Sequence, residues 1–438
     1  MEANNQNPNQ RRSVAARLGL SKNVFWMGVV SFLNDLSSDM IFPFIPIFLT
    51  SILGASLTFV GLVEGIADAT ASLLKIPSGW ISDRMKRRKP FAVFGYSLSA
   101  ISKPLLALAS LPWHVLGVRF LDRVGKGTRE SPRDALISFS TPRSLLGRAF
   151  GFHRAMDTLG AATGPLLAAL ILPFINENYR VLFFLSFIAS FFAVLVLVLF
   201  VREVRLDGSD SGTPETVKPL IQDVRPPLEV KPQPAVSQGW RNLGAPFFLF
   251  LMVATIASLG KASEAFLILR AREIGLAIAL IPIAYFAYSI TAALLGTPLG
   301  MVADRVGKRN TFVAGLVVFA ISYIGFSLTS SLKAFWFLLI LYGLYSALTD
   351  GVGRAVVAGL VAPEVRATAF GIYNATTGLA LLPASFVFGY FSQQFGSHVA
   401  FLYGAGLSLV AVFLFFICLS RIPRPDRGRG GGECHTNK

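Results

Sequence analysis

Long apolar stretches alternate with short polar segments along most of this chain. A helix that crosses a membrane needs about 20 mostly apolar residues, and the clearest such runs include residues 183–200 and 335–348. The pattern predicts an all-α membrane protein with twelve transmembrane helices, several of which contain charged residues. The expected spans are residues 24–50, 57–82, 90–110, 113–139, 146–173, 178–202, 245–271, 277–303, 311–329, 333–361, 367–393 and 398–420.

Charged residues are scarce, which supports the membrane assignment. They make up 15% of the chain, against about 25% in an ordinary soluble protein. Most lysines and arginines fall in the loops on one side of the predicted bundle, together with both chain ends. Since basic loops stay in the cytoplasm, we expect a multi-pass protein of the plasma (inner) membrane with both termini cytoplasmic. This placement explains the net charge of +16 without a nucleic-acid partner. The opposite loops contain only Arg180, Arg270, Arg272 and Lys333.

A polar segment divides the predicted helices into six and six. Residues 203–244 are rich in Pro, Ser and charge, and we expect them to form a disordered cytoplasmic linker. The predicted domains are therefore a six-helix bundle at 24–202 and a second at 245–420. A cytoplasmic tail precedes them at 1–23, and a flexible basic tail follows at 421–438.

The two halves resemble each other in sequence. GWISDRMKRRK at 79–89 recurs as GMVADRVGKRN at 300–310, an offset of 221 residues. The segment at 147–160 recurs at 366–380 with an offset near 220. A duplicated six-helix unit is a plan of secondary transporters, which bind substrate between the halves near the middle of the membrane.

The repeated loops, with two further motifs, resemble the major facilitator superfamily. RFLDRVGKG at 119–127 is similar to its fourth-helix motif, and GAATGP at 160–165 to the fifth-helix motif of its proton-coupled exporters. The resemblance implies an antiporter-like role for Gly160, Gly164 and Pro165. The Asp near a helix end and the Arg cluster in each loop favour a charge lock that holds one alternating conformation, whereas simple positive-inside anchoring explains their Arg and Lys but not their Gly and Asp. The loop residues are Gly79, Asp83, Arg84, Arg87, Arg88, Gly300, Asp304, Arg305, Gly307 and Arg309.

Eight charged residues lie on one side of the fourth predicted helix, between Arg119 and Asp134. At about 100° per residue they share an arc of roughly 140°. A charge at the bilayer centre costs about 2.5–3.5 kcal/mol, so the deeper ones must face a wet cavity or paired partners. A cavity-lining role is favoured over purely structural ion pairs. These deeper residues are Arg119, Asp122, Arg123 and Lys126.

Four acids of the first and second predicted helices are the candidates for proton coupling, because intramembrane acids mark proton relays in transporters. The alternative is a permanent ion pair, which is the favoured interpretation for Asp122 beside Arg123 and for Asp157 beside Arg154. His153 is expected to be a polar packing residue rather than a proton relay. The four candidates are Asp35, Asp39, Glu64 and Asp68.

A wider charge network lies mainly in the N-terminal half, and the C-terminal half is expected to supply more apolar and aromatic lining. The cations either bind an anionic substrate, since arginine offers a bidentate fork to carboxylate or phosphate, or neutralise the nearby acids. The network is Asn34, Lys75, Arg119, Asp122, Arg123, Lys126, Arg154, Asp157, Lys261, Glu264, Asp350 and Arg354.

The leading hypothesis is a secondary active transporter that works by alternating access and couples efflux of a small molecule to protons. Two alternatives stay open: a proton-coupled uptake symporter for an organic anion or metal chelate, and a non-transporting membrane receptor with the same fold. The sequence has no nucleotide-binding loop, zinc-protease motif or nucleophile elbow, which argues against an enzyme. We expect a monomer without cofactor or metal site, whose partners are the lipid bilayer, protons and a small-molecule substrate.

Overall fold

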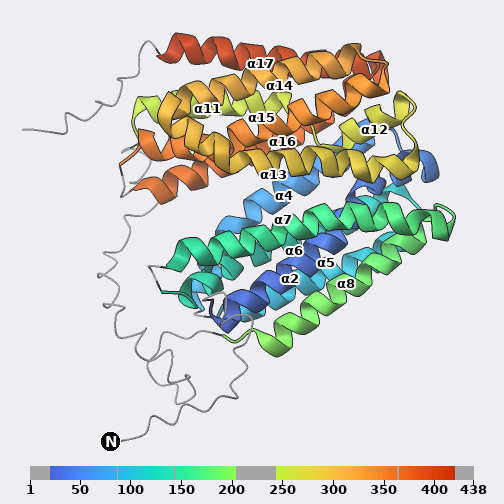
Figure 1. Cartoon of the computed structure of the whole chain (residues 1–438), viewed down its shortest axis with the longest axis vertical. Coiled ribbons are helices and arrows are strands. Elements are labelled where there is room, and N and C mark those ends of the chain that lie inside the picture. The colour runs from blue at the N-terminus through green and yellow to red at the C-terminus, as the bar shows by residue number, and fades with distance from the viewer. Residues whose placement is uncertain (1–19, 86, 143–144, 204–242, 363–364, 420–438) are drawn as a thin grey trace, which may run out of the picture.

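The computed structural model describes residues 20–85, 87–142, 145–203, 243–362 and 365–419, and every regular element in these ranges is helical (Figure 1). Ten helical segments are long and apolar enough to cross a membrane, by length and composition. The prediction of an all-α membrane protein is confirmed. Most of both predicted tails and of the predicted linker lies outside the described residues.

The N-terminal half contains six long helices. Two of them, α5 and α6, match predicted spans but are not among the ten, because polar and charged residues interrupt them. After the first helix the chain continues through η1 (Phe42–Phe44), α3 (Ile45–Ile47) and η2 (Phe48–Ile52). Pro43 and Pro46 account for these changes of helix type, since proline lacks the backbone N–H that an α-helix requires. The long helices are α2 (Lys22–Ile41), α4 (Leu57–Arg84), α5 (Lys89–Ala107), α6 (Pro112–Phe139), α7 (Leu146–Ile171) and α8 (Tyr179–Phe200).

The C-terminal half differs from the prediction at its first span. Residues 245–271 were expected as one helix, but the structure breaks it into α11 (Ala245–Gly260) and α12 (Ala265–Glu273). Lys261 is extended at the break, and Ser263 N donates to Ser385 Oγ at 3.2 Å instead of to a carbonyl of its own helix. The later helices are α13 (Ile281–Val306), α14 (Lys308–Leu328), α15 (Leu332–Leu360), α16 (Arg366–Phe395) and α17 (Ser397–Leu419).

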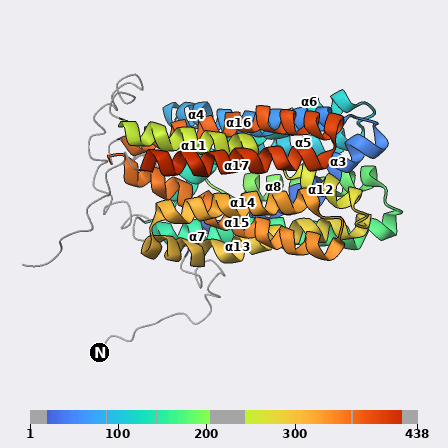
Figure 2. The same ribbon diagram turned by 90° about the horizontal axis from the view of Figure 1, so that it is seen from above.

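The two halves repeat one packing plan, with their helices side by side along a common direction (Figure 2). In the N-terminal half α2 packs against α7 and α8, α6 against α4 and α5, and α5 against α8. In the C-terminal half α11 packs against α16 and α17, α15 against α13 and α14, and α14 against α17. The sequence repeat is therefore a structural repeat.

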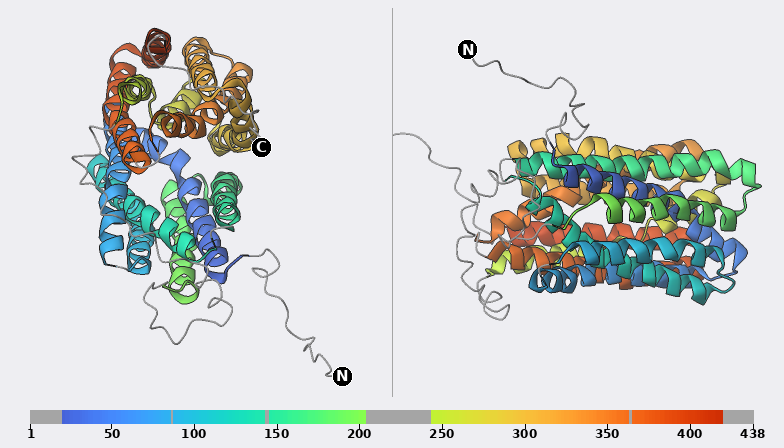
Figure 3. Two further views of the ribbon diagram at one scale, coloured as in Figure 1. Left: turned by 90° about the vertical axis from the view of Figure 1, so that its left-hand side faces the viewer. Right: turned by 90° about the horizontal axis from the view of Figure 1, so that it is seen from below.

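The halves meet mainly through α4 and α16, and also through α7 and α13 (Figure 3). Glycines permit this approach: a Cβ at Gly61 would overlap the carbonyl oxygen of Ser385, and one at Gly389 would lie 2.5 Å from that of Leu57. Close contacts of this kind with α16 occur between Leu57 and Ser72 of α4. Farther along the helix, Trp80 is 62% exposed.

The hydrophobic core follows the same division. One cluster joins residues of both halves, such as Phe44 and Phe326, where α4 begins. At the other end there are two separate clusters, one around Leu136 and one around Phe415. We call the first end the joined end. The second is called the basic end, and α4, α6, α13 and α15 end there while α5, α7, α14 and α16 begin there.

Candidate functional site

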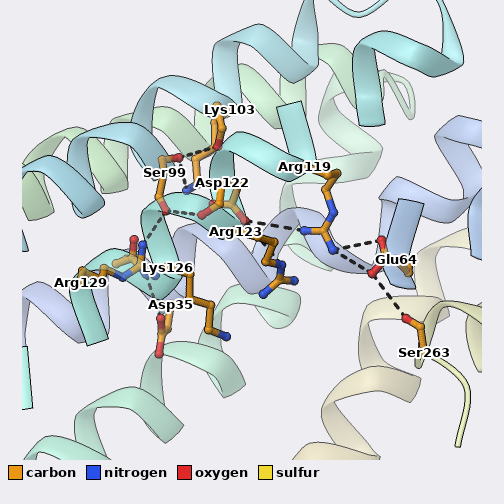
Figure 4. Close-up of polar contacts among 12 residues, drawn as sticks. Asp35, Glu64, Ser99, Lys103, Arg119, Asp122, Arg123, Lys126, Arg129 and Ser263 are labelled. Atoms are coloured by element: carbon orange, nitrogen blue, oxygen red, sulfur yellow. Dashed lines mark hydrogen bonds and ion pairs between the residues drawn. The ribbon is translucent and has the colours of Figure 1, made fainter. Parts of the chain in front are cut away.

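A buried ion pair joins α4 and α6 of the N-terminal half (Figure 4). Arg119 Nη2 on α6 donates to both carboxylate oxygens of Glu64 on α4, at 3.0 and 2.8 Å. The two side chains are 6% and 1% exposed. Asp122 Oδ2 lies 3.8 Å from Arg119 Nη1 and 3.9 Å from Arg123 Nε, so two arginines share this carboxylate. The expected pairing of Asp122 with Arg123 is present.

The charged face of α6 points into the protein, as the helical arc predicted. Arg119 and Arg129 are each 5% exposed. On the opposite face Trp113 is 63% exposed and Phe120 is 44% exposed. This orientation keeps charge out of lipid, where it is costly, and offers apolar side chains to the bilayer.

Hydroxyl groups of the C-terminal half reach two acids of the N-terminal half. Ser263 Oγ, in the break between α11 and α12, donates to Glu64 Oε2 at 3.4 Å. Tyr285 Oη on α13 donates to Asp39 Oδ1 at 3.4 Å. Neither hydroxyl is recognisable from the sequence as a partner, because they lie 199 and 246 residues from the acids that they contact. The two contacts place Asp39 and Glu64 at the boundary between the halves.

A lysine that the sequence analysis passed over is buried on the far side of α6. Lys103 is 1% exposed, and its Nζ donates to the carbonyl oxygen of Ser99 at 3.0 Å. Arg129 Nη1 donates to Ser99 Oγ at 2.5 Å, and its guanidinium lies 4.6 Å from the Tyr96 ring centroid. A lysine inside the predicted span 90–110 was itself a signal of an internal polar site.

The remaining cations of this face are more open. Glu130 forms ion pairs with two lysines: its Oε2 lies 2.6 Å from Lys75 Nζ, and its Oε1 lies 4.0 Å from Lys126 Nζ. Both lysine side chains are more than 40% exposed, at 43% and 41%. Arg123 and Lys126 project to the same side of α6, away from Lys103 (Figure 4). Asp68 lies one turn from Glu64 on α4, and its charge acts on Arg123.

The contact between α2 and α7 contains the other acids. Asn34 Nδ2 donates to Asp35 Oδ1 at 2.9 Å. Asp157 Oδ2 lies 3.5 Å from His153 Nδ1, and Arg154 is exposed. The expected pairing of Asp157 with Arg154 is thus replaced by one with His153, because α7 turns residues 153 and 157 toward α2 and residue 154 outward.

The fifth-helix motif lies at the same contact. A Cβ at Gly160 would lie 2.5 Å from the carbonyl oxygen of Phe32, and one at Gly164 the same distance from that of Leu36. Pro165 follows inside α7. Only glycine fits so close an approach of two helices.

The C-terminal half combines few charges with many aromatic rings, as expected. Glu264 Oε1 lies 3.7 Å from Lys261 Nζ and accepts from Tyr288 Oη at 3.5 Å. Asp350 accepts from Ser346 Oγ at 2.5 Å, and both Asp350 and Arg354 are exposed. Glu264 also lines a small apolar cavity between α12, α13 and α15. The surrounding aromatic cluster includes Phe319, Tyr285, Tyr288, Tyr323, Tyr342 and Tyr345.

The repeated loops lie at the basic end. Gly307 has φ of 107°, a conformation that favours glycine, and Lys308 Nζ lies 3.7 Å from Asp304 Oδ1. In the first copy, Arg88 N donates to Glu203 Oε2 at 3.0 Å. The side chain of Asp83 lies outside the described part of the structure. Among the other loop residues, Gly79 lies against Ser131, and the Arg84 guanidinium lies over the Trp80 ring. Arg309 is half-buried, and Arg87 and Arg305 are exposed. A Cβ at Gly300 would meet no other atom within 4 Å.

Within the described ranges, no three His, Cys, Asp or Glu side chains are grouped to hold a metal ion. The polar groups that the site presents are ion pairs, hydroxyl groups and carboxylates. Such groups bind charged or polar solutes and protons.

Comparison with known proteins gives one family and one fold. The family model described as Major Facilitator Superfamily matches residues 27–268 and 262–435. An uncharacterized MFS-type transporter of Methanocaldococcus jannaschii is 35% identical over 405 residues, covering 91% of this chain and 95% of the relative. A multidrug resistance protein MdtH of Baumannia cicadellinicola is 23% identical over 346 residues, covering 78% and 77%.

Solved structures agree on the fold. A bacterial homolog of the human lysosomal transporter Spinster, in an inward-facing and occupied conformation, has a TM-score of 0.74 at 15% identity, covering 91% of this chain and 96% of that one. The nucleoside transporter NupG has a TM-score of 0.70 at 15% identity, covering 90% and 98%.

Proposed function

Because the chain belongs to the major facilitator superfamily, we propose that this multi-pass membrane protein is a secondary active transporter that exports a small molecule in exchange for protons. Its two halves alternate in exposing a site between them to either side of the membrane. This mode of transport suits two bundles of repeated structure with a site between them.

The division of the hydrophobic core is the observation that carries this proposal. The core is shared at the joined end and separate at the basic end. Basic loops favour a cytoplasmic location, so the proposed state opens inward and presents Lys75 and Lys126 to the cytoplasm. Rocking of the halves would separate the joined end and bring together the two clusters at the basic end.

Two features favour export. The first is the close contact of α7 with α2 at Gly160 and Gly164, in the segment that resembles the fifth-helix motif of proton-coupled exporters. The second is the set of relatives named as multidrug resistance proteins. In this proposal Asp35, Asp39, Glu64 and Asp68 are the candidates that exchange protons.

Inverted membrane vesicles with an acidic interior test the proposal. Lipophilic cations, organic anions and metal–citrate complexes are added outside, and the internal pH is followed with a fluorescent probe. An exporter dissipates the gradient when its substrate is added, and Asp35→Asn or Asp68→Asn abolishes the response in protein that inserts normally. Wild-type coupling in both variants would remove those two assignments.

The exposed lysines also favour an anionic substrate, which is the basis of a second candidate function. A proton-coupled uptake symporter for an organic anion would use Lys75 and Lys126 as its cations. The same vesicles separate the two directions. A symporter accumulates the anion in right-side-out vesicles when the exterior is acidic, and added anion does not dissipate the gradient of inverted vesicles.

A further inference from the structure

A serine, a histidine and an aspartate lie in a row at the contact between α2 and α7. Ser31 Oγ lies 2.8 Å from His153 Nε2, and His153 Nδ1 lies 3.5 Å from Asp157 Oδ2. On its other side Ser31 Oγ lies 3.3 Å from Tyr96 Oη of α5. Ser31 and Tyr96 are each 1% exposed and His153 is 3% exposed. The row therefore crosses three helices inside the N-terminal half.

These residue types also form the catalytic row of serine hydrolases, but burial excludes that chemistry here. A hydrolase needs space at the serine oxygen for a substrate carbonyl, and Ser31 Oγ is enclosed by His153 and Tyr96. Proton binding needs no such space. A neutral imidazole carries a proton on one nitrogen and accepts on the other, so this row supports two protonation arrangements.

The aspartate at the end of the row has an unused oxygen. Asp157 Oδ1 is buried and makes no hydrogen bond among the described residues, and the Ser31 hydroxyl lies near this carboxyl group as well as near His153. Leaving a buried acceptor unsatisfied costs about 1–3 kcal/mol, and more for a charged group. A proton bound to the carboxylate removes its charge and so removes much of that cost.

We propose that His153 and Asp157 together hold one exchangeable proton, and that Ser31 selects which imidazole nitrogen is protonated. This inference rests on the proposed proton coupling and names a site for it outside the four acids of α2 and α4. When Asp157 is ionised, His153 Nδ1–H donates to it and Nε2 accepts from Ser31. When a proton adds to Asp157, the acid donates to Nδ1, and the proton of the imidazole lies on Nε2 facing Ser31.

The neighbouring charges place this unit in contact with the larger network. The charge of Asp157 acts on Asp35 of α2, which connects the unit to a predicted proton-coupling acid. The charged residues of α13, which also packs against α7, are Asp304 and Arg305 near its basic end. The titratable and charged groups of the other helices that act on His153 and Asp157 are Asp35 (α2), Tyr96 (α5), and Arg133 and Asp134 (α6); Arg154 acts from α7 itself, although its side chain is exposed.

The position of α7 explains how the proton would influence transport. α7 contacts α2 at Gly160 and Gly164 too closely for any side chain, and it also packs against α13 of the other half. A change of charge at Asp157 therefore acts on a helix that belongs to the contact between the halves.

Nitrogen NMR of the full-length protein in lipid nanodiscs tests the proposal without knowledge of the substrate. The chain has four histidines, so isotope-labelled histidine gives few signals, and His153→Gln assigns the relevant one. We expect the signal of His153 to change from the Nδ1–H to the Nε2–H tautomer as the pH falls. In Asp157→Asn this pH response should disappear. A response in Asp157→Asn equal to that of the wild type would overturn the proposal.

Two further variants complete the test. His114→Gln removes an exposed histidine and should leave the response of His153 unchanged. If Asp157→Asn does not fold, Ser31→Ala is the substitute: we expect a mixture of tautomers, and an unchanged single tautomer would refute the role of Ser31. A proton-responsive His153 in a protein that dissipates no gradient would support this site and contradict proton-coupled transport.

Discussion

Glu64 and Tyr285 occupy equivalent positions in the two halves, because they are separated by the repeat offset of 221 residues. Glu64 lies on α4 and accepts from Ser263 of the C-terminal half at 3.4 Å. Tyr285 lies on α13 and donates to Asp39 of the N-terminal half at 3.4 Å. The repeat thus makes the same kind of contact twice, once with a carboxylate and once with a phenol.

Other charged positions of the N-terminal half differ more strongly from their equivalents in the C-terminal half. At the same offset, Arg119 corresponds to Ile340 and Arg123 to Leu344. The C-terminal half nevertheless packs its helices in the same plan. The fold therefore does not require the buried charges of the N-terminal half. Such charges are expensive in a membrane, so we propose that those of the N-terminal half serve transport.

Removing one partner of the buried ion pair should have the largest effect. Arg119→Ala leaves Glu64 charged and unpaired, which costs about 3–5 kcal/mol. We expect a corresponding loss of thermal stability in detergent. The double variant Glu64→Met with Arg119→Met should recover most of it while losing transport. A double variant as unstable as Arg119→Ala would mean that the N-terminal half needs the ion pair to fold, although the C-terminal half folds with Tyr285 and Ile340 at the equivalent positions.

The close helix contact should give the next largest effect. Gly164 corresponds to Ala384 at the offset near 220, and a Cβ at Gly164 would lie 2.5 Å from the carbonyl oxygen of Leu36. Gly164→Ala should destabilise the protein by about 1–3 kcal/mol through overpacking. Ala384→Gly should cost at most about 1 kcal/mol. Equal melting temperatures for the two variants would show that α2 and α7 do not need their closer approach.

The cross-half hydrogen bond of Tyr285 should have a smaller effect. Tyr285→Phe removes one hydroxyl, worth about 0.5–1.5 kcal/mol, and should weaken the joined end without unfolding either half. The measurement is the rate at which a thiol reagent labels a cysteine placed at Ile76, near the basic end of α4. We expect slower labelling than in the parent protein, because the inward-open state is less populated. Labelling at an unchanged rate would show that this hydrogen bond does not bias the two states.

The smallest expected effect concerns the start of the linker. Glu203 accepts from the backbone N–H groups of Arg88 and Lys89 at the first turn of α5, at 3.0 and 2.8 Å. Glu203→Gln keeps the hydrogen bonds but removes the charge, which should cost about 0.3–1 kcal/mol at a helix N-terminus. A small decrease in melting temperature, reduced further by salt, is the expected result. A decrease that is insensitive to salt would argue against a charge effect.

The fold was largely predictable because helix spans depend on local hydropathy. The inward face of α6 was also predictable from local sequence, because the spacing of Arg119, Asp122 and Arg123 along a helix determines their arc. The break at residues 261–264 was not predictable, because it depends on Ser385 of a distant helix. The spacing of His153 and Asp157 was visible in the sequence, but their neighbour Ser31 comes from another helix, which hid the row.

The most direct test of the central claim is a distance measurement between the halves at the basic end. Spin labels would be attached to cysteines introduced at Ile76 on α4 and Gly371 on α16, after Cys418 and Cys434 are replaced by serine. The distance between the labels would be measured in nanodiscs by pulsed electron paramagnetic resonance. If charge in the N-terminal half couples protons to alternating access, two distance populations should exchange as the pH changes. Asp35→Asn should remove this exchange. A single distance at every pH, in both proteins, would contradict the account.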